Sequence, residues 1–164
     1  DKEDYELICK PRLLKEKYVL MFGWNTNSDL VEAAKQVSKK LGLPIYNIVP
    51  PPRKMFCGIP RKLDVGPCEF LSMIKNAEFV VTNSFHGTAF STTFEKPYVS
   101  IVSGKADTRM HSLLAQLGLS DHLVTKDNID VDKMLATDFT PVRDRKKALR
   151  QTSFDYLKNA LKGL

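Results

Sequence analysis

The chain has 164 residues, of which 43% are hydrophobic, and its formal net charge at pH 7 is +6. This length suits one hydrophobic core and is too short for two ordinary domains. No stretch approaches the roughly 20 apolar residues of a membrane-spanning helix, and the first residues are charged, unlike those of a signal peptide. We therefore expect one soluble domain with no transmembrane segment.

The three cysteines, Cys9, Cys57 and Cys68, are odd in number and widely spaced, with no histidine cluster at metal-ligand spacing beside them. This pattern indicates neither a disulfide framework nor a zinc site, and it fits a reducing cytoplasm. The basic residues are spread along the chain and are not gathered into one block with aromatic neighbours. The positive charge therefore favours a phosphorylated small molecule over nucleic acid.

The first half of the chain alternates strand and helix signals. Residues 18–24 are a short apolar run, and residues 29–41 carry apolar side chains at helical spacing before Gly42. Residues 44–50 predict a second strand. Residues 50–67 are rich in proline, glycine and cations, which is typical of a surface loop, although the apolar run 55–57 could form a strand.

The second half continues the same alternation. A helix is predicted from Gly66-Pro67 to about residue 76, because proline is tolerated at the first helical position. Strands are predicted at 78–81, 98–102 and 122–125, and further helices after residue 84, around 110–117 and from 140 to about 162. Successive βα units predict an α/β fold, with a Rossmann-like parallel sheet and helices on both faces.

A candidate site follows the third predicted strand, in the sequence Thr82-Asn83-Ser84-Phe85-His86-Gly87-Thr88. In open parallel sheets ligands bind beyond the carboxyl ends of the strands, where a helix N-terminus directs its amide groups at an anion. We expect the amides of residues 85–88 and the hydroxyls of Ser84 and Thr88 to hold such an anion beside His86. An equally good interpretation is structural, with Ser84 capping a helix and Gly87 allowing it to pack closely.

The segment from Gly66 to Ser91, and above all Glu78-Phe79-Val80-Val81-Thr82-Asn83-Ser84-Phe85-His86-Gly87-Thr88-Ala89-Phe90-Ser91, resembles the hallmark of the polysaccharide pyruvyl transferase family. Arg109 and the following leucine-rich segment to Leu119 are similar to the family's arginine and Leu-Gly-Leu ending. The resemblance covers roughly residue 18 to the C-terminus. It implies one lobe of a GT-B-like fold, in which two Rossmann-like lobes face a cleft.

This resemblance divides the chain into a linker or N-terminal extension, residues 1–17, and the C-terminal Rossmann-like lobe, residues 18–164. The family's N-terminal lobe, with an arginine-containing segment near its end, has no counterpart here. We therefore expect residues 1–164 to be inactive without that lobe.

The family's reaction moves the pyruvyl group of phosphoenolpyruvate onto two hydroxyls of a sugar in a polysaccharide or its lipid-linked precursor, as a cyclic ketal. The resemblance implies phosphoenolpyruvate as donor substrate, no cofactor and no metal. It places the reaction in the cytoplasm, or at the inner face of the membrane for a lipid-linked acceptor.

His86 is the candidate catalytic residue, as donor of a proton to the methylene carbon of the substrate. Arg109 is the candidate second anion contact, because a guanidinium meets phosphate or carboxylate at two points; an exposed arginine at a helix start is an equally good interpretation. The predicted substrate-binding residues are Asn83, Ser84, Phe85, Gly87, Thr88, Arg109 and Ser103. Cations of the 50–67 loop, which could reach the acceptor, are Arg53, Lys54, Arg61 and Lys62.

Two other functions stay open on sequence alone. A glycosyltransferase lobe would hold a nucleotide sugar at the same edge of the sheet. A non-catalytic sugar- or partner-binding module could keep the fold without the chemistry, because a fold does not fix a function.

Overall fold

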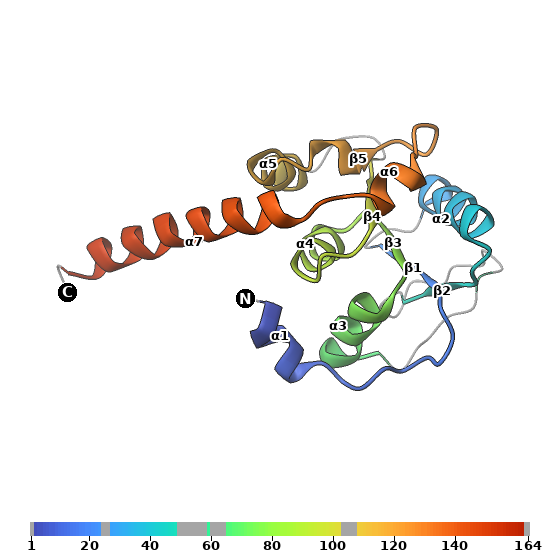
Figure 1. The fold of residues 1–164 in the computed structure, drawn as a ribbon, viewed down its shortest axis with the longest axis horizontal. Coiled ribbons are helices and arrows are strands. Elements are labelled where there is room, and N and C mark those ends of the chain that lie inside the picture. The colour runs from blue at the N-terminus through green and yellow to red at the C-terminus, as the bar shows by residue number, and fades with distance from the viewer. Residues whose placement is uncertain (1, 24–26, 49–58, 60–64, 103–107, 163–164) are drawn as a thin grey trace.

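Helices alternate with strands along almost the whole chain (Figure 1). The computed structural model describes residues 2–23, 27–48, 59, 65–102 and 108–162. Its elements are α1 (Lys2–Ile8), β1 (Val19–Phe22), α2 (Ser28–Leu41), β2 (Ile45–Asn47), α3 (Pro67–Asn76), β3 (Phe79–Thr82), α4 (Phe85–Thr93), β4 (Tyr98–Ile101), α5 (Thr108–Leu117), a 3-10 turn (Ser120–His122), β5 (Leu123–Val124), α6 (Val131–Leu135) and α7 (Thr140–Leu161).

The five strands form one sheet in the order β2-β1-β3-β4-β5, and every neighbouring pair is parallel. In the central pair Val19 lies opposite Phe79 and Phe22 opposite Thr82. All four residues of β3 and of β4 are buried, as expected for strands covered on both faces. The predicted α/β Rossmann-like fold is therefore confirmed.

Two hydrophobic clusters fill the two faces of the sheet. On one face, α2 and α6 pack over strand residues such as Met21 and Val81. On the other, α3, α4, α5 and the start of α7 pack over Leu20, Val80 and Tyr98. Figure 1 shows the sheet between these two helical layers. Alternate strand side chains point to opposite faces, so each strand contributes to both clusters.

The ends of α2 and α3 have the local chemistry expected from their sequences. The Asn27 side chain accepts a hydrogen bond of 2.9 Å from the amide of Leu30, which satisfies one of the unpaired amides at the start of α2. Gly42 ends this helix in the left-handed conformation. Pro67 occupies the first turn of α3.

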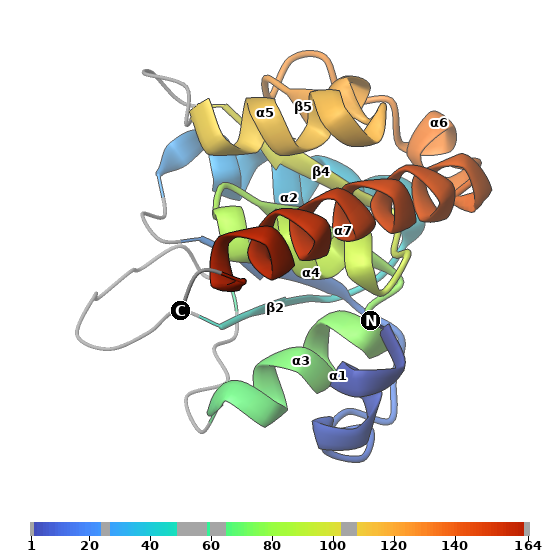
Figure 2. The same ribbon diagram turned by 90° about the vertical axis from the view of Figure 1, so that its left-hand side faces the viewer.

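Helix α7 leaves the body of the molecule (Figure 1), and Figure 2 shows it crossing in front of α4. Val142 is its one buried residue, and large apolar side chains of its outer half are exposed. Arg145 ties its base to α5 through a hydrogen bond of 2.8 Å to the carbonyl oxygen of Leu117. None of the described helices is long and apolar enough to cross a membrane.

The segment 1–17, expected to be a linker or extension, contains α1, which the sequence did not predict. After α1, Leu13 and Leu14 pack against the core on the α3 side of the sheet. Of the cysteines, Cys9 and Cys68 are free thiols. Cys57 and the possible strand at 55–57 lie outside the described residues.

Candidate functional site

The candidate site lies where the strand order reverses. The chain passes from β1 through α2 to β2 on one side, and the sheet then grows from β3 through β4 to β5 on the other. Helix α2 follows β1 onto one face, while α4 follows β3 onto the opposite face. Open α/β sheets bind ligands at such a switch point, and we call this place, at the carboxyl ends of β1 and β3, the crevice.

The close approach of α4 to the end of β3 depends on Gly87. A Cβ atom at this position would come within 2.9 Å of the Thr82 Cβ and 3.1 Å of the Phe22 Cδ1. Such distances are shorter than van der Waals contact, so any side chain would push α4 away from the crevice. Gly87 thus has the structural role that was one of the two interpretations from sequence, and it also holds the start of α4 at the crevice.

Helix α4 begins with three amide groups directed at the crevice. Ser84 is its N-cap in an extended conformation, and its hydroxyl makes no hydrogen bond to the first turn. The amide of Thr88 is already paired, at 2.9 Å, with the carbonyl oxygen of Ser84. The amides of residues 85–87 precede the first intrahelical hydrogen bond and have no acceptor within the described part of the chain. Of the four amides predicted to hold an anion, that of Thr88 is therefore already paired.

The Thr88 hydroxyl does not fit the ligand contact that we expected of it. Thr88 is fully buried, and its hydroxyl lies 2.7 Å from the Ser100 hydroxyl and 3.1 Å from the Ser84 carbonyl oxygen. Because a buried hydroxyl needs such partners, this side chain fastens α4 to β4. Ser100, which the sequence analysis did not single out, shares in that contact.

Three predicted residues meet at the mouth of the crevice. His86 is exposed on the first turn of α4, and its ring centroid lies 6.0 Å from that of the half-buried Phe85. The guanidinium carbon of Arg109, from the first turn of α5, lies 5.3 Å from the Phe85 ring centroid. The geometry suits a cation-π contact, which holds a positive charge beside the start of α4.

Asn83 lies on the β1 side of the same crevice. Its side-chain oxygen occupies the space that a Cβ atom of Gly23 would need, and Leu30 of α2 bounds the same space. Gly23 was missed from sequence, although a glycine directly after an apolar strand is a signal for close approach to a backbone. Together Gly23, Asn83 and Ser84 line the two strand ends.

Several predicted contacts fall outside the described residues. They are Ser103 with Gly104 after β4, and the loop cations Arg53, Lys54, Arg61 and Lys62. Of the predicted site residues, the structure brings Asn83, Ser84, Phe85, His86, Gly87 and Arg109 to one edge of the sheet.

Comparison with solved structures supports the fold. The UDP-GlcNAc 2-epimerase of Methanocaldococcus jannaschii, in complex with UDP-GlcNAc and UDP, superposes with a TM-score of 0.53 at 15% identity. The match covers 93% of this chain and 48% of that one. The glycotransferase of kitacinnamycin gives a TM-score of 0.52 at 14% identity, covering 92% of this chain and 44% of that one. The chain thus has the fold of one GT-B-like lobe and spans about half the length of these proteins.

Comparison by sequence identifies the family. No curated protein matches the sequence closely enough to count as a relative. The family model for polysaccharide pyruvyl transferase matches residues 3–104, more than half of the chain, including both strand ends of the crevice. The chain therefore belongs to the polysaccharide pyruvyl transferase family.

Proposed function

We propose that this chain is the donor-binding lobe of an enzyme that transfers the pyruvyl group of phosphoenolpyruvate to a sugar. The observation that carries the proposal is the start of α4, where three amides, His86 and the Arg109 guanidinium surround one edge of the crevice. Preorganised N–H groups and a fixed cation are what a small dianion requires. Family membership supplies the reaction class.

In the proposed reaction the amides of residues 85–87 and Arg109 hold the phosphate and carboxylate of the donor. His86 delivers a proton to the methylene carbon, which becomes a methyl group, and positive charge develops on the adjacent carbon. One sugar hydroxyl attacks that carbon, and its proton restores the charged form of His86. A second hydroxyl displaces the phosphate, and its proton leaves with the phosphate as hydrogen phosphate. The product is a cyclic ketal.

We further infer that a second Rossmann-like lobe carries the acceptor and faces this crevice. The support is the length of the structural neighbours, of which this chain matches only 48% and 44%. We expect the acceptor to be a polysaccharide sugar or its lipid-linked precursor, met in the cytoplasm or at the inner face of the membrane. Residues 1–164 alone would then bind the donor without turning it over.

Thermal unfolding with two competing ligands tests the donor. We expect phosphoenolpyruvate to raise the midpoint of residues 1–164 by several degrees at a concentration of about 100 Kd. UDP is the matched control, because a nucleotide-sugar lobe would prefer it. Stabilisation by UDP and none by phosphoenolpyruvate would refute the proposed donor.

Turnover tests the role of His86 in a form of the protein that has both lobes. General acid catalysis contributes about 10²-fold or more, so His86→Gln should lower kcat by that factor while donor binding is largely retained. Phosphate release from phosphoenolpyruvate in the presence of acceptor measures the rate. A near-normal kcat would remove His86 from the mechanism.

A further inference from the structure

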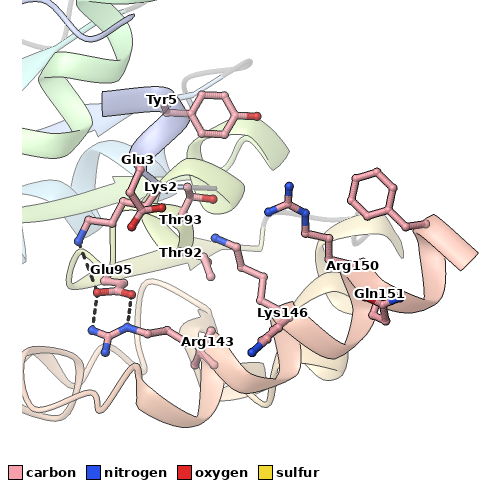
Figure 3. Close-up of a pocket in the computed structure, with 13 residues that line it drawn as sticks. Lys2, Glu3, Tyr5, Thr92, Thr93, Glu95, Arg143, Lys146, Arg150 and Gln151 are labelled. Atoms are coloured by element: carbon pink, nitrogen blue, oxygen red, sulfur yellow. Dashed lines mark hydrogen bonds and ion pairs between the residues drawn. The ribbon is translucent and has the colours of Figure 1, made fainter. Parts of the chain in front are cut away.

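Figure 3 shows a cleft of about 1100 Å³. It lies at the C-terminal end of α4, whereas the crevice lies at the start of that helix. Its walls are α1 on one side and α7 on the other, and its floor is the last turn of α4 together with Glu95, two residues beyond the helix. The proposed donor site does not use it. Pockets of about 300–1,000 Å³ accommodate drug-sized ligands, so the volume suits a molecule larger than phosphoenolpyruvate.

Glu95 fixes the floor of this cleft. Its carboxylate accepts two hydrogen bonds from Arg143, of 2.5 and 2.8 Å, and lies 3.5 Å from the Lys2 ammonium (Figure 3). Glu95 adopts a φ of 56°, a left-handed conformation that persists in a non-glycine residue only where its surroundings enforce it. These contacts join α1 to α7 and neutralise the carboxylate.

Three further cations of α7 line the cleft, namely Lys146, Lys147 and Arg150. Lys146 is half-buried and has no ion-pair partner among the described residues, and desolvation by burial lowers its pKa. The guanidinium carbon of Arg150 lies 5.3 Å from the Phe154 ring centroid. The remaining carboxylate of the lining is Glu3, so the cleft has an excess of positive charge.

Each wall of the cleft also carries an aromatic side chain, Tyr5 on one and Phe154 on the other. Tyr5 of α1 packs edge-on against Phe90 with ring centroids 5.1 Å apart, which holds it in place. Phe154 of α7 lines the other wall and is 46% exposed. Cations beside aromatic rings suit a ligand with an anionic group attached to a sugar ring or an apolar chain.

We propose that the α1–α7 cleft is a second anion-binding site, which takes a ligand that carries a diphosphate group. Lys146, Lys147 and Arg150 lie within five consecutive residues of helix, which rise about 6 Å along its axis, and this spacing matches two linked phosphoryl groups better than one. The ligand's anionic group would supply the partner that Lys146 lacks, and its attached ring or chain would lie against Tyr5 and Phe154. The diphosphate can belong to a soluble molecule or to a headgroup at a membrane surface.

Titration calorimetry with inorganic pyrophosphate tests the soluble source. The variant Lys146→Gln/Arg150→Gln removes two cations of the cleft. The control Lys158→Gln/Lys162→Gln removes the same charge at the C-terminal end of α7, where neither residue lines the cleft. Each charge-assisted hydrogen bond contributes about tenfold or more in affinity, so we expect at least a tenfold loss in the first variant. The second should stay within about twofold of the unaltered chain, and circular dichroism checks that both fold.

Sedimentation with vesicles tests the membrane source. The probes are phosphatidylcholine vesicles with and without diacylglycerol pyrophosphate, whose headgroup is a diphosphate. Vesicle binding that needs diacylglycerol pyrophosphate and is lost only in Lys146→Gln/Arg150→Gln supports a membrane ligand in the cleft. Pyrophosphate binding that is lost only in the same variant supports a soluble ligand. Equal losses in both variants, unchanged binding in the cleft variant, or no binding of either probe would overturn the proposal.

Discussion

The guanidinium carbon of Arg109 lies 5.3 Å from the ring centroid of Phe85, although the whole of β4 separates the two residues in the chain. They meet because β3 and β4 are adjacent and parallel, with Thr82 opposite Ser100, so the helices that follow both strands begin at the same edge of the sheet. One helix start contributes amides and His86, and the other contributes a cation. A small anion between them would contact both.

Substitution of Arg109 should weaken donor binding. We expect Arg109→Gln to lower the affinity for phosphoenolpyruvate about tenfold, because a charge-assisted pair is lost. Arg109→Lys should recover only part of it, since an ammonium lacks the planar fork. Calorimetry measures both, with Lys39→Gln on the exposed side of α2 as the charge-matched control. Equal affinities for Arg109→Gln and the control would exclude Arg109 from the site.

Substitution of Gly87 should destabilise the fold. In Gly87→Ala the new methyl group would overlap Thr82 and approach Phe22, and such overpacking costs about 1–3 kcal/mol. Urea unfolding measures the loss. Gly66→Ala is the control, because there the near neighbour is the end of the flexible Glu69 side chain, and we expect it to cost less than about 1 kcal/mol. A Gly87→Ala chain as stable as the parent would contradict the packing described at the crevice.

His122 should make stability depend on pH. It is buried, with Nδ1 2.9 Å from the Tyr98 carbonyl oxygen and Nε2 3.2 Å from the Thr137 hydroxyl, and burial lowers its pKa below the usual 6.5. The unfolded chain therefore takes up a proton at this position at higher pH than the folded chain does. Its contribution to stability is complete above pH 6.5 and is lost as the pH falls below that value.

Unfolding of His122→Gln in urea at pH 7.5, 6.5 and 5.5 isolates this contribution. The variant should be less stable at pH 7.5, because buried hydrogen bonds and ring packing are lost, but the gap to the parent chain should narrow at pH 5.5. His86 and His111 are exposed and present in both chains, so they do not affect the comparison. A gap that stays constant with pH would show that His122 does not titrate as described.

Glu95 should also make stability depend on pH, but in a lower pH range and because of an ion pair. Its hydrogen bonds from Arg143 lower the pKa of its carboxyl below the usual 4.5. The charge contribution is therefore present above pH 4.5 and is lost as the pH falls through the lower, folded-state pKa. Glu95→Gln should cost about 1 kcal/mol at pH 7 and progressively less below pH 4.5, as urea unfolding would show. Glu32→Gln on the exposed side of α2 is the control. A cost of Glu95→Gln that does not change with pH would contradict the pairing with Arg143.

Much of this architecture follows from patterns that one sequence contains. The apolar runs predicted all five strands, with ends that differ from the structure by at most three residues, and the start of α4 was placed correctly after residue 84. The side chain of Thr88 could not be placed, because its partner Ser100 lies on a different strand. Sequence spacing shows that a threonine lies in the first turns, but not whether its hydroxyl is buried.

Short helices and long-range burial were the features that sequence missed. Helix α1 buries no residue and α6 has five residues, so neither carries a periodic apolar pattern. The Asp130 side chain caps α6 through the Lys133 amide at 3.0 Å, a local signal that could have indicated it. The exposure of α7 depends on which elements stand opposite it, and helical spacing alone does not contain that information.

The parallel strand order also constrains how the chain reaches its native state. Val19 of β1 lies opposite Phe79 of β3, a neighbour sixty residues further along, so the central pair of strands must close a long loop before it can form. Sheets built from such distant partners fold more slowly than helical bundles or hairpins of the same size. A chain in which β3 has not yet paired exposes one edge of β1 to strands of other molecules. Because such pairing leads to aggregation, the yield of refolding should fall as the protein concentration rises.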